Sequence, residues 1–235
     1  MSDISNRLVL SGKITSLPRL SHEMFNEKIY YARLSVPRLS GSEDDLHLTI
    51  PGTLLSAIPA LNIGDTLHCE CTLRSYNITD EAGQRHLLLT AFVDHFLPTV
   101  ETPDVNQLTL TGVICKPPMY RKTPFGREIT DMMVCVDRAH GKRDYIPCIA
   151  WGSNARYASR LKPGSKVALT GRLQSRQYDK LLPDGTMETR MTLEVSINRL
   201  TFVPTQPSTE ATNPSTCQPV PAIPVVIQNG GIMHA

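Results

Sequence analysis

Hydrophobic and polar residues alternate with a period of two through most of the chain, which is the pattern of half-buried β-strands. In the second half of the chain this alternation predicts five strands, within residues 108–113, 127–136, 144–151, 167–173 and 191–197. Turn-forming residues at 123–126 and 183–185 separate two of the strand pairs. Ala155, Ala158 and Leu161 recur at helical spacing after the third strand, so we predict one short helix over residues 153–161.

The chain repeats itself at an offset of one hundred residues. Residues 6–12 (NRLVLSG) return as residues 106–112 (NQLTLTG), and Ser75 returns as Ser175. The repeat predicts the same order of elements in the first half, with a weaker helix over residues 54–61. Two copies of this length indicate a duplicated domain, because a solenoid has shorter and more numerous repeats.

Five strands with a helix between the third and the fourth are the element order of an OB-fold, a small Greek-key barrel. We therefore predict an all-β protein with two tandem OB-fold five-stranded barrels, each with one short helix. The expected domains are residues 1–100 and residues 101–204. Residues 205–235 are rich in Pro, Ser and Thr and poor in charge, and are predicted to form a disordered C-terminal tail.

The two halves differ in charge, although the whole chain carries only +2. Residues 1–100 hold 8 Lys/Arg against 11 Asp/Glu (−3), and residues 101–204 hold 16 against 10 (+6). A basic domain is typical of a polyanion-binding protein. The six cysteines lack the paired spacing of zinc sites, and no apolar stretch is long enough to span a bilayer. We therefore expect core thiols, no metal, no cofactor, no membrane contact and a cytoplasmic protein.

Strand parity gives the candidate binding residues. Tyr145 and Trp151 share the outward face of the predicted third strand, and Arg172, Arg176 and Tyr178 share that of the fourth. Aromatic rings stack on bases for about 1–3 kcal/mol each, and arginines neutralise phosphates, so this combination favours single-stranded nucleic acid. The neighbouring loops add further candidates, namely Tyr120, Arg121, Arg127, Arg138, His140 and Lys142.

Several motifs of the second half are more specific than its strand pattern. They are LTG at 110–112, TPFGRE at 123–128, AWG at 150–152 and GRLQSRQY at 171–178. Through these motifs, residues 106–203 closely resemble bacterial single-stranded DNA-binding proteins. The resemblance implies base-stacking roles for Tyr145, Trp151 and Tyr178, and places a further family aromatic near His140. The first half has Asp45, Pro51 and Ile78 at the positions of the three stacking residues, so we expect the second half to be the main binding domain.

The resemblance also implies sequence-independent protection of single-stranded DNA in replication, recombination and repair. Because this chain carries two barrels, it implies a homodimer with four OB-folds. The family has an acidic C-terminal tip that recruits replication and repair proteins, whereas this chain ends in GGIMHA. We therefore do not expect recruitment of partners by that route.

Three other interpretations remain open at this point. The same fold serves RNA-binding and replication-accessory proteins, and stacking alone does not distinguish the two sugars. An enzyme would require catalytic residues, and the sequence has neither a glycine-rich phosphate loop nor a recognisable nucleophile and base. A metal site built from His68, Cys69 and Cys71 is less favoured than a pair of core thiols. A purely architectural protein would keep its oligonucleotide affinity after its aromatic residues are truncated.

Overall fold

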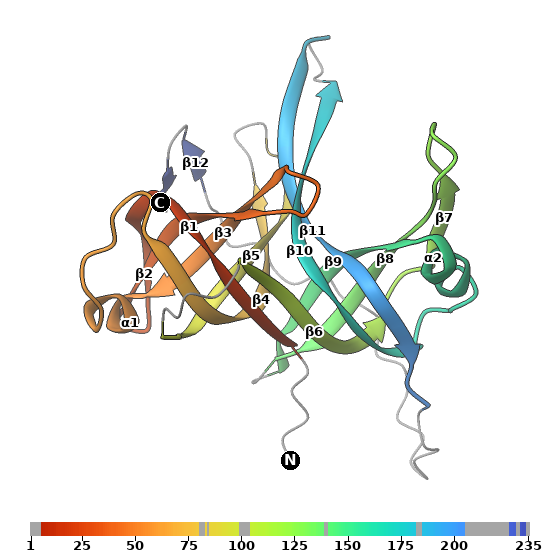
Figure 1. Cartoon of the computed structure of the whole chain (residues 1–235), viewed down its shortest axis with the longest axis horizontal. Coiled ribbons are helices and arrows are strands. Elements are labelled where there is room, and N and C mark those ends of the chain that lie inside the picture. Colours follow the sequence, from red (N-terminus) through yellow and green to blue (C-terminus); the bar gives the residue numbers. More distant parts are fainter. Residues whose placement is uncertain are drawn as a thin grey trace.

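The computed structural model describes residues 6–79, 83, 85–98, 104–138, 141–181, 185–204, 226–228 and 231–233. Eleven strands form one sheet that closes into two barrels lying side by side (Figure 1). The first barrel consists of β1 (Asn6–Met24), β2 (Glu27–Pro37), β3 (Glu43–Pro51), helix α1 (Gly52–Ser56), β4 (Thr66–Thr79) and β5 (Arg85–Phe96). It closes because β1 pairs with both β2 and β4, while β3 and β5 pair in parallel.

The second barrel repeats this arrangement. Its elements are β6 (Val105–Ile114), β7 (Met119–Lys122), β8 (Glu128–Asp137), β9 (Arg143–Trp151), helix α2 (Gly152–Ala158), β10 (Lys166–Leu181) and β11 (Met187–Phe202). Here β6 pairs with both β8 and β10, and β9 pairs in parallel with β11. The predicted pair of OB-fold barrels, each with one helix after its third strand, is confirmed.

The elements differ from their predicted bounds in ways that have local causes. Helix α1 ends at Ser56, because Pro59 cannot donate the backbone hydrogen bond that a longer helix would need. The prolines at 117 and 118 likewise separate β6 from β7, whereas β1 runs unbroken through the equivalent part of the first barrel. Strands β10 and β11 extend beyond their barrel as a two-stranded ribbon, which projects upward in Figure 1.

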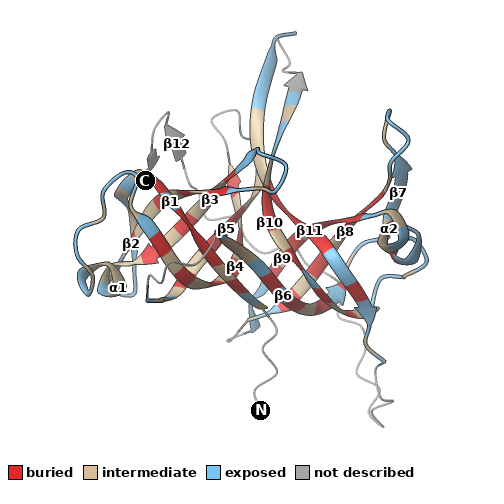
Figure 2. Ribbon diagram, in the orientation of Figure 1, coloured by how far each residue is buried: buried red, intermediate tan, exposed pale blue. Residues whose placement is uncertain are grey.

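The two barrels share one hydrophobic core, because β1 and β6 pair antiparallel between them. Leu8 lies directly opposite Leu108 in this pairing, and both are buried. Buried residues alternate with partly buried ones along most of the barrel strands (Figure 2). Gly12 and Gly112 occupy equivalent positions where no side chain fits. A Cβ atom would lie 2.3 Å from the Ser35 carbonyl oxygen in the first case and 2.5 Å from that of Cys135 in the second.

Residues 205–235, which the sequence predicts to be disordered, lie largely outside the described residues. Within them the structure describes β12 (Val226–Gln228) and β13 (Gly231–Met233), which pair antiparallel with each other. Across the described ranges, no helix is long and apolar enough to cross a membrane.

A partly buried histidine on β3, on the strand face opposite the core residues Leu46 and Leu48, makes the stability of the first barrel depend on pH. Burial lowers the pKa of His47 from 6.5 to about 4, with a smaller opposing effect of Asp45. Below pH 6.5 the unfolded chain therefore binds a proton that the folded chain does not, so stability falls as the pH decreases from 6.5 to about 4. We expect a loss on the order of 2 kcal/mol over this range. Urea unfolding at pH 7 and pH 4.5 should show a smaller pH effect in His47→Gln than in the wild type. Parallel pH profiles would contradict this assignment.

Candidate nucleic-acid interface

An open groove of about 560 Å³ runs across the second barrel. Its floor includes Ile129 of β8 and Ile149 of β9, which belong to the second and third strands of the barrel. Oligonucleotides bind to this face in OB-folds, with help from the loops between strands 1 and 2 and strands 4 and 5. Five arginines line the groove, whereas Glu194 is its only carboxylate among the described residues; the arginines are Arg38, Arg121, Arg127, Arg172 and Arg176.

Trp151 is the aromatic residue of the groove. It is the last residue of β9, and Gly152 follows with a φ of 55°, so that the chain turns sharply from strand into helix at this point. The indole Nε1 donates a hydrogen bond to Ser196 Oγ on β11 at 3.1 Å, while the residue remains 36% exposed. The ring is thus held in place before any ligand arrives, which lowers the entropic cost of stacking on a base.

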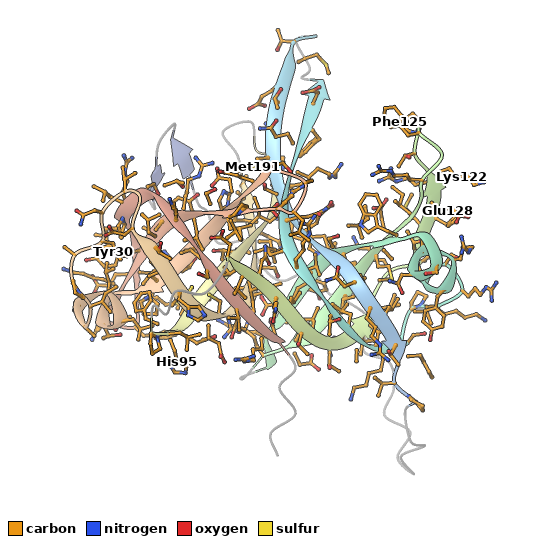
Figure 3. The ribbon with its side chains drawn as sticks, viewed as in Figure 1. Tyr30, His95, Lys122, Phe125, Glu128 and Met191 are labelled. Carbon is orange, nitrogen blue, oxygen red and sulfur yellow. The ribbon has the colours of Figure 1, made fainter. Side chains whose placement is uncertain are left out.

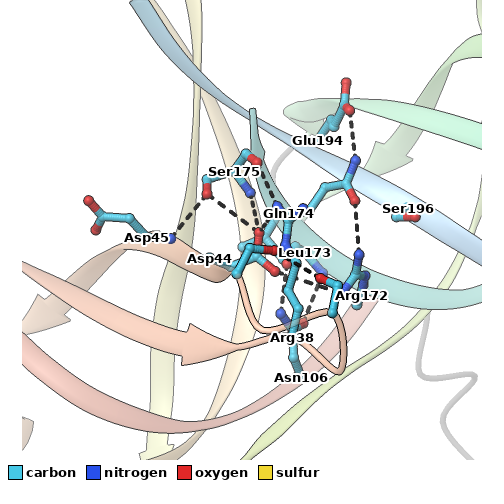
Figure 4. A network of polar contacts seen from close by, with 12 residues as sticks. Arg38, Asp44, Asp45, Asn106, Arg172, Leu173, Gln174, Ser175, Glu194 and Ser196 are labelled. Atoms are coloured by element: carbon cyan, nitrogen blue, oxygen red, sulfur yellow. Dashed lines mark hydrogen bonds and ion pairs between the residues drawn. The ribbon is translucent and has the colours of Figure 1, made fainter. Parts of the chain in front are cut away.

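The arginines of β10 are fixed by a short polar network along the strand (Figure 4). Arg172 Nη2 donates to Gln174 Oε1 at 3.4 Å, and Gln174 Nε2 donates to Glu194 Oε1 at 2.8 Å. Arg176 Nε lies 3.4 Å from the other oxygen of Glu194. The nearly buried carboxylate of Glu194 therefore orients both Arg172 and Arg176. Because one negative charge meets two positive charges, this part of the groove keeps an excess of positive charge.

The hairpin between β7 and β8 forms the outer wall of the groove. Its turn is closed by hydrogen bonds from the backbone amides of Gly126 and Arg127 to the carbonyl and hydroxyl oxygens of Thr123. Arg121 pairs with Asp131 at 2.7 Å across the hairpin. Figure 3 shows Phe125 at the tip, where it is 92% exposed. The hairpin therefore places its arginines above the barrel face.

Five of the residues predicted from the sequence lie together in the groove: Arg121, Arg127, Trp151, Arg172 and Arg176. Tyr178 lies just beyond them on β10, with the Arg176 guanidinium 5.9 Å from the centre of its ring. Tyr178 therefore extends the same row of arginine and aromatic side chains along the β10–β11 ribbon.

The other predicted residues lie elsewhere. Tyr120 does not line the groove; its hydroxyl donates to Glu128 at 2.7 Å, and Glu128 also pairs with Arg156 of α2. Lys142 is exposed in the turn between β8 and β9 and is not part of the groove. Tyr145 is half-buried at the contact with the first barrel, where its backbone amide donates to Ser75 Oγ at 2.8 Å. His140 lies outside the described residues.

Arg138, also predicted as a binding residue, lies at the contact between the two barrels. Its guanidinium forms an ion pair with the buried Asp144 at 2.6 Å and lies 5.7 Å from the ring centre of Tyr76 in the first barrel. Arg138 is therefore engaged in the contact between the barrels, and we leave it out of the proposed binding surface. Its repeat partner Arg38 does line the groove. The offset of one hundred residues linked these two arginines, but it did not indicate that they face different surfaces.

The sulfur pair of the first barrel is part of the core. Cys69 and Cys71 are buried on β4 with their Sγ atoms 3.5 Å apart, and burial raises the pKa of the Cys71 thiol. His68 directly precedes Cys69 in the sequence, and its Nδ1 is 3.1 Å from the Pro98 carbonyl oxygen. Within the described parts of the chain, no three His, Cys, Asp or Glu side chains are grouped as metal ligands would be.

An OB-fold barrel with a basic groove and an exposed aromatic residue defines a nucleic-acid-binding class of protein. Comparison with known proteins narrows the class. Residues 105–203 match the model of the single-strand binding protein family. The single-stranded DNA-binding protein of Bacillus cereus is 37% identical over 82 residues, covering 32% of this chain and 48% of that protein. Single-stranded DNA-binding protein A of Bacillus subtilis is 35% identical over the same length and coverage. The chain thus spans about half the length of these curated relatives.

The solved structure of wild-type single-stranded DNA binding protein from Thermus aquaticus shares the two-barrel fold. Its TM-score is 0.69 at 19% sequence identity, and the match covers 88% of this chain and 96% of that one. The family match is confined to the second barrel, and the likeness to the Thermus aquaticus structure extends the shared fold to both barrels.

Proposed function

We propose that this protein binds single-stranded DNA without sequence preference and protects it during replication, recombination and repair. The groove that combines Trp151 with five arginines carries the proposal. The names of the Bacillus relatives and the family match of residues 105–203 support it. A titration of fluorescent oligo-dT, with a duplex of equal length as competitor, tests it directly. Equal affinity for duplex and single strand would contradict the proposal.

Binding requires no chemical step. Bases stack on Trp151 and Tyr178, while the arginines pair with phosphates and release the counterions condensed on the DNA. Every base has a π-face, and every nucleotide has the same phosphate, so neither interaction selects a sequence. The arrangement therefore favours a protein that covers exposed strands of any sequence.

The number of phosphate contacts predicts how binding depends on salt. Each phosphate contacted by a cation on a single strand contributes about −0.7 to the slope of log affinity against log salt concentration. If three to five groove arginines bind phosphates, we expect a slope of about −2 to −3.5. Oligo-dT titrations between 50 and 300 mM NaCl (roughly a sixfold range) measure it. A flat response would show that the arginines do not contact phosphates.

RNA is the competing ligand, because stacking and phosphate pairing do not depend on the 2′-hydroxyl. Competition between oligo-dT and oligo-U of equal length separates the two. We expect oligo-dT to compete more strongly. Stronger competition by oligo-U would favour the RNA-binding or replication-accessory interpretation.

A homodimer with four OB-folds is a further part of the proposal, supported by the family resemblance of the second barrel. The chain has a mass of 26.0 kDa, so a dimer has twice that mass. Light scattering coupled to size-exclusion chromatography distinguishes the dimer from the single chain.

A further inference from the structure

We propose that Arg38 of the first barrel binds a phosphate in the groove of the second barrel, so that the single-stranded DNA site is composite. This inference rests on the proposed function and adds to it a role for the first barrel. Arg38 and Ser40 come from the turn between β2 and β3, yet both line the groove formed mainly by β7 to β11.

The turn that carries Arg38 is rigid. The backbone amide of Arg38 donates to the Ser42 carbonyl at 2.7 Å, and that of Gly41 donates back to the Arg38 carbonyl at 2.9 Å. Gly41 has a φ of 86°, in the left-handed region that glycine adopts without strain. A tight, glycine-dependent turn holds Arg38 at a fixed position relative to its own barrel.

A reciprocal network then attaches this turn to the second barrel (Figure 4). Arg38 Nη2 donates to the Ser175 carbonyl oxygen at 2.8 Å and also pairs with Asp44. Asp44 accepts a hydrogen bond from the Ser175 backbone amide at 2.7 Å, and the amide of Asp45 donates to Ser175 Oγ at 3.1 Å. Arg38 is therefore bound to β10, the strand that also carries the groove residues Arg172 and Arg176.

The charge distribution favours an anion at this wall of the groove. Asp44 is 1% exposed and does not line the groove, whereas Arg38 lines it with 21% of its side chain exposed. Arg172 Nη1 lies 4.0 Å from the same carboxylate. One buried negative charge thus holds two guanidinium groups, and their excess positive charge faces the space where the DNA backbone would lie. Arginine pairs well with phosphate because its planar fork matches two phosphate oxygens.

The internal repeat supplies a matched control. Arg138 pairs with Asp144 at 2.6 Å, and Asp144 accepts from the Ser75 backbone amide at 2.6 Å, which mirrors the contacts of Arg38. The surface of the first barrel on that side has Pro51 and Thr72 where the second has Trp151 and Arg172. Arg138 and Arg38 therefore make equivalent structural contacts, but only Arg38 lies beside the stacking residue.

The experiment compares Arg38→Gln with Arg138→Gln in the full chain. Both variants lose one cation of the network, so we expect similar decreases in melting temperature. Only Arg38→Gln should bind oligo-dT more weakly, by roughly 5- to 20-fold at low salt. Its salt slope should also be shallower by about 0.7, because one phosphate contact is lost. Arg38→Lys, which keeps the charge, should retain the slope of the wild type.

If Arg38→Gln does not fold, a second pair of variants tests the side of the groove that the β2–β3 turn forms. Ser40 and Ser42 are both exposed in the turn and their hydroxyl oxygens lie 2.9 Å apart, but only Ser40 lines the groove. Ser40→Glu should weaken oligo-dT binding by charge repulsion, and Ser42→Glu should weaken it less.

The outcomes separate this inference from the proposed function. Equal losses of affinity in Arg38→Gln and Arg138→Gln would mean that Arg38 acts only through the packing of the barrels. Unchanged binding in Arg38→Gln and Ser40→Glu, together with weaker binding in Trp151→Ala, would overturn the composite site and leave the proposed function intact. Unchanged binding in all three variants would overturn both.

Discussion

Oligo-dT affinity is expected to fall by about 1–3 kcal/mol when Trp151 is replaced by alanine, and by a similar amount in Tyr178→Ala. Each substitution removes one stacking platform from the row of aromatic and arginine side chains in the second barrel. Since the losses at independent sites add, the double variant should lose about 2–6 kcal/mol. Fluorescence titration at one fixed salt concentration measures all three variants.

Tyr157→Ala is the matched control for this loss. Tyr157 lies on α2 and is 40% exposed, close to the 36% of Trp151, but it does not line the groove. Its truncation should leave oligo-dT affinity within about twofold of the wild type. If Trp151→Ala and Tyr178→Ala bind as tightly as Tyr157→Ala while their circular dichroism is unchanged, the site is wrongly assigned. That result would favour an architectural role for the barrels.

Asp144→Ala is expected to destabilise the folded chain by about 3–5 kcal/mol. Asp144 is completely buried, accepts hydrogen bonds from Ser75 and holds Arg138 at 2.6 Å and Arg74 at 3.6 Å. Removing its carboxylate leaves two guanidinium groups without their counter-charge at the contact between the barrels. Both arginines are about one-fifth exposed, so water partly replaces the lost partner and the lower end of the range is expected.

Urea unfolding measures this loss, and Asp137→Ala controls for the removal of a carboxylate as such. Asp137 pairs with Arg143 at 2.8 Å on the surface, where the aspartate side chain is 77% exposed. Water screens such a pair, so its loss should cost about 0–1 kcal/mol. Similar losses of stability in the two variants would show that the buried network does not hold the barrels together.

The strand pattern predicted most of the fold because its cause is local. Each barrel buries one side of its strands, so the period of two in the sequence follows directly from the pleat of the backbone. The predicted strands of the second barrel coincide with β6 and β8 to β11, although β10 and β11 run well beyond the predicted ends. The extension of β10 and β11 depends on pairing between two polar segments outside the core, so the hydrophobic pattern does not predict it.

The candidate site was predictable where strand parity decides it. Trp151, Arg172 and Arg176 were predicted from alternation and line the groove. Tyr145 has the same outward parity, but a neighbouring barrel lies against its part of the strand. Parity distinguishes the inside of a barrel from its outside; it does not distinguish solvent from a second domain.

The sequence by itself determined that this protein is two copies of one barrel, with the excess of basic residues and the predicted stacking aromatics in the second copy. It did so because core alternation and turn residues are properties of residues close together in the chain, and the repeat follows from comparing the two halves of the sequence. Only the tertiary structure decided that Arg38 joins the groove while Arg138 joins the contact between the barrels. Their local sequences are alike, and their different surroundings arise from contacts between residues more than 60 positions apart.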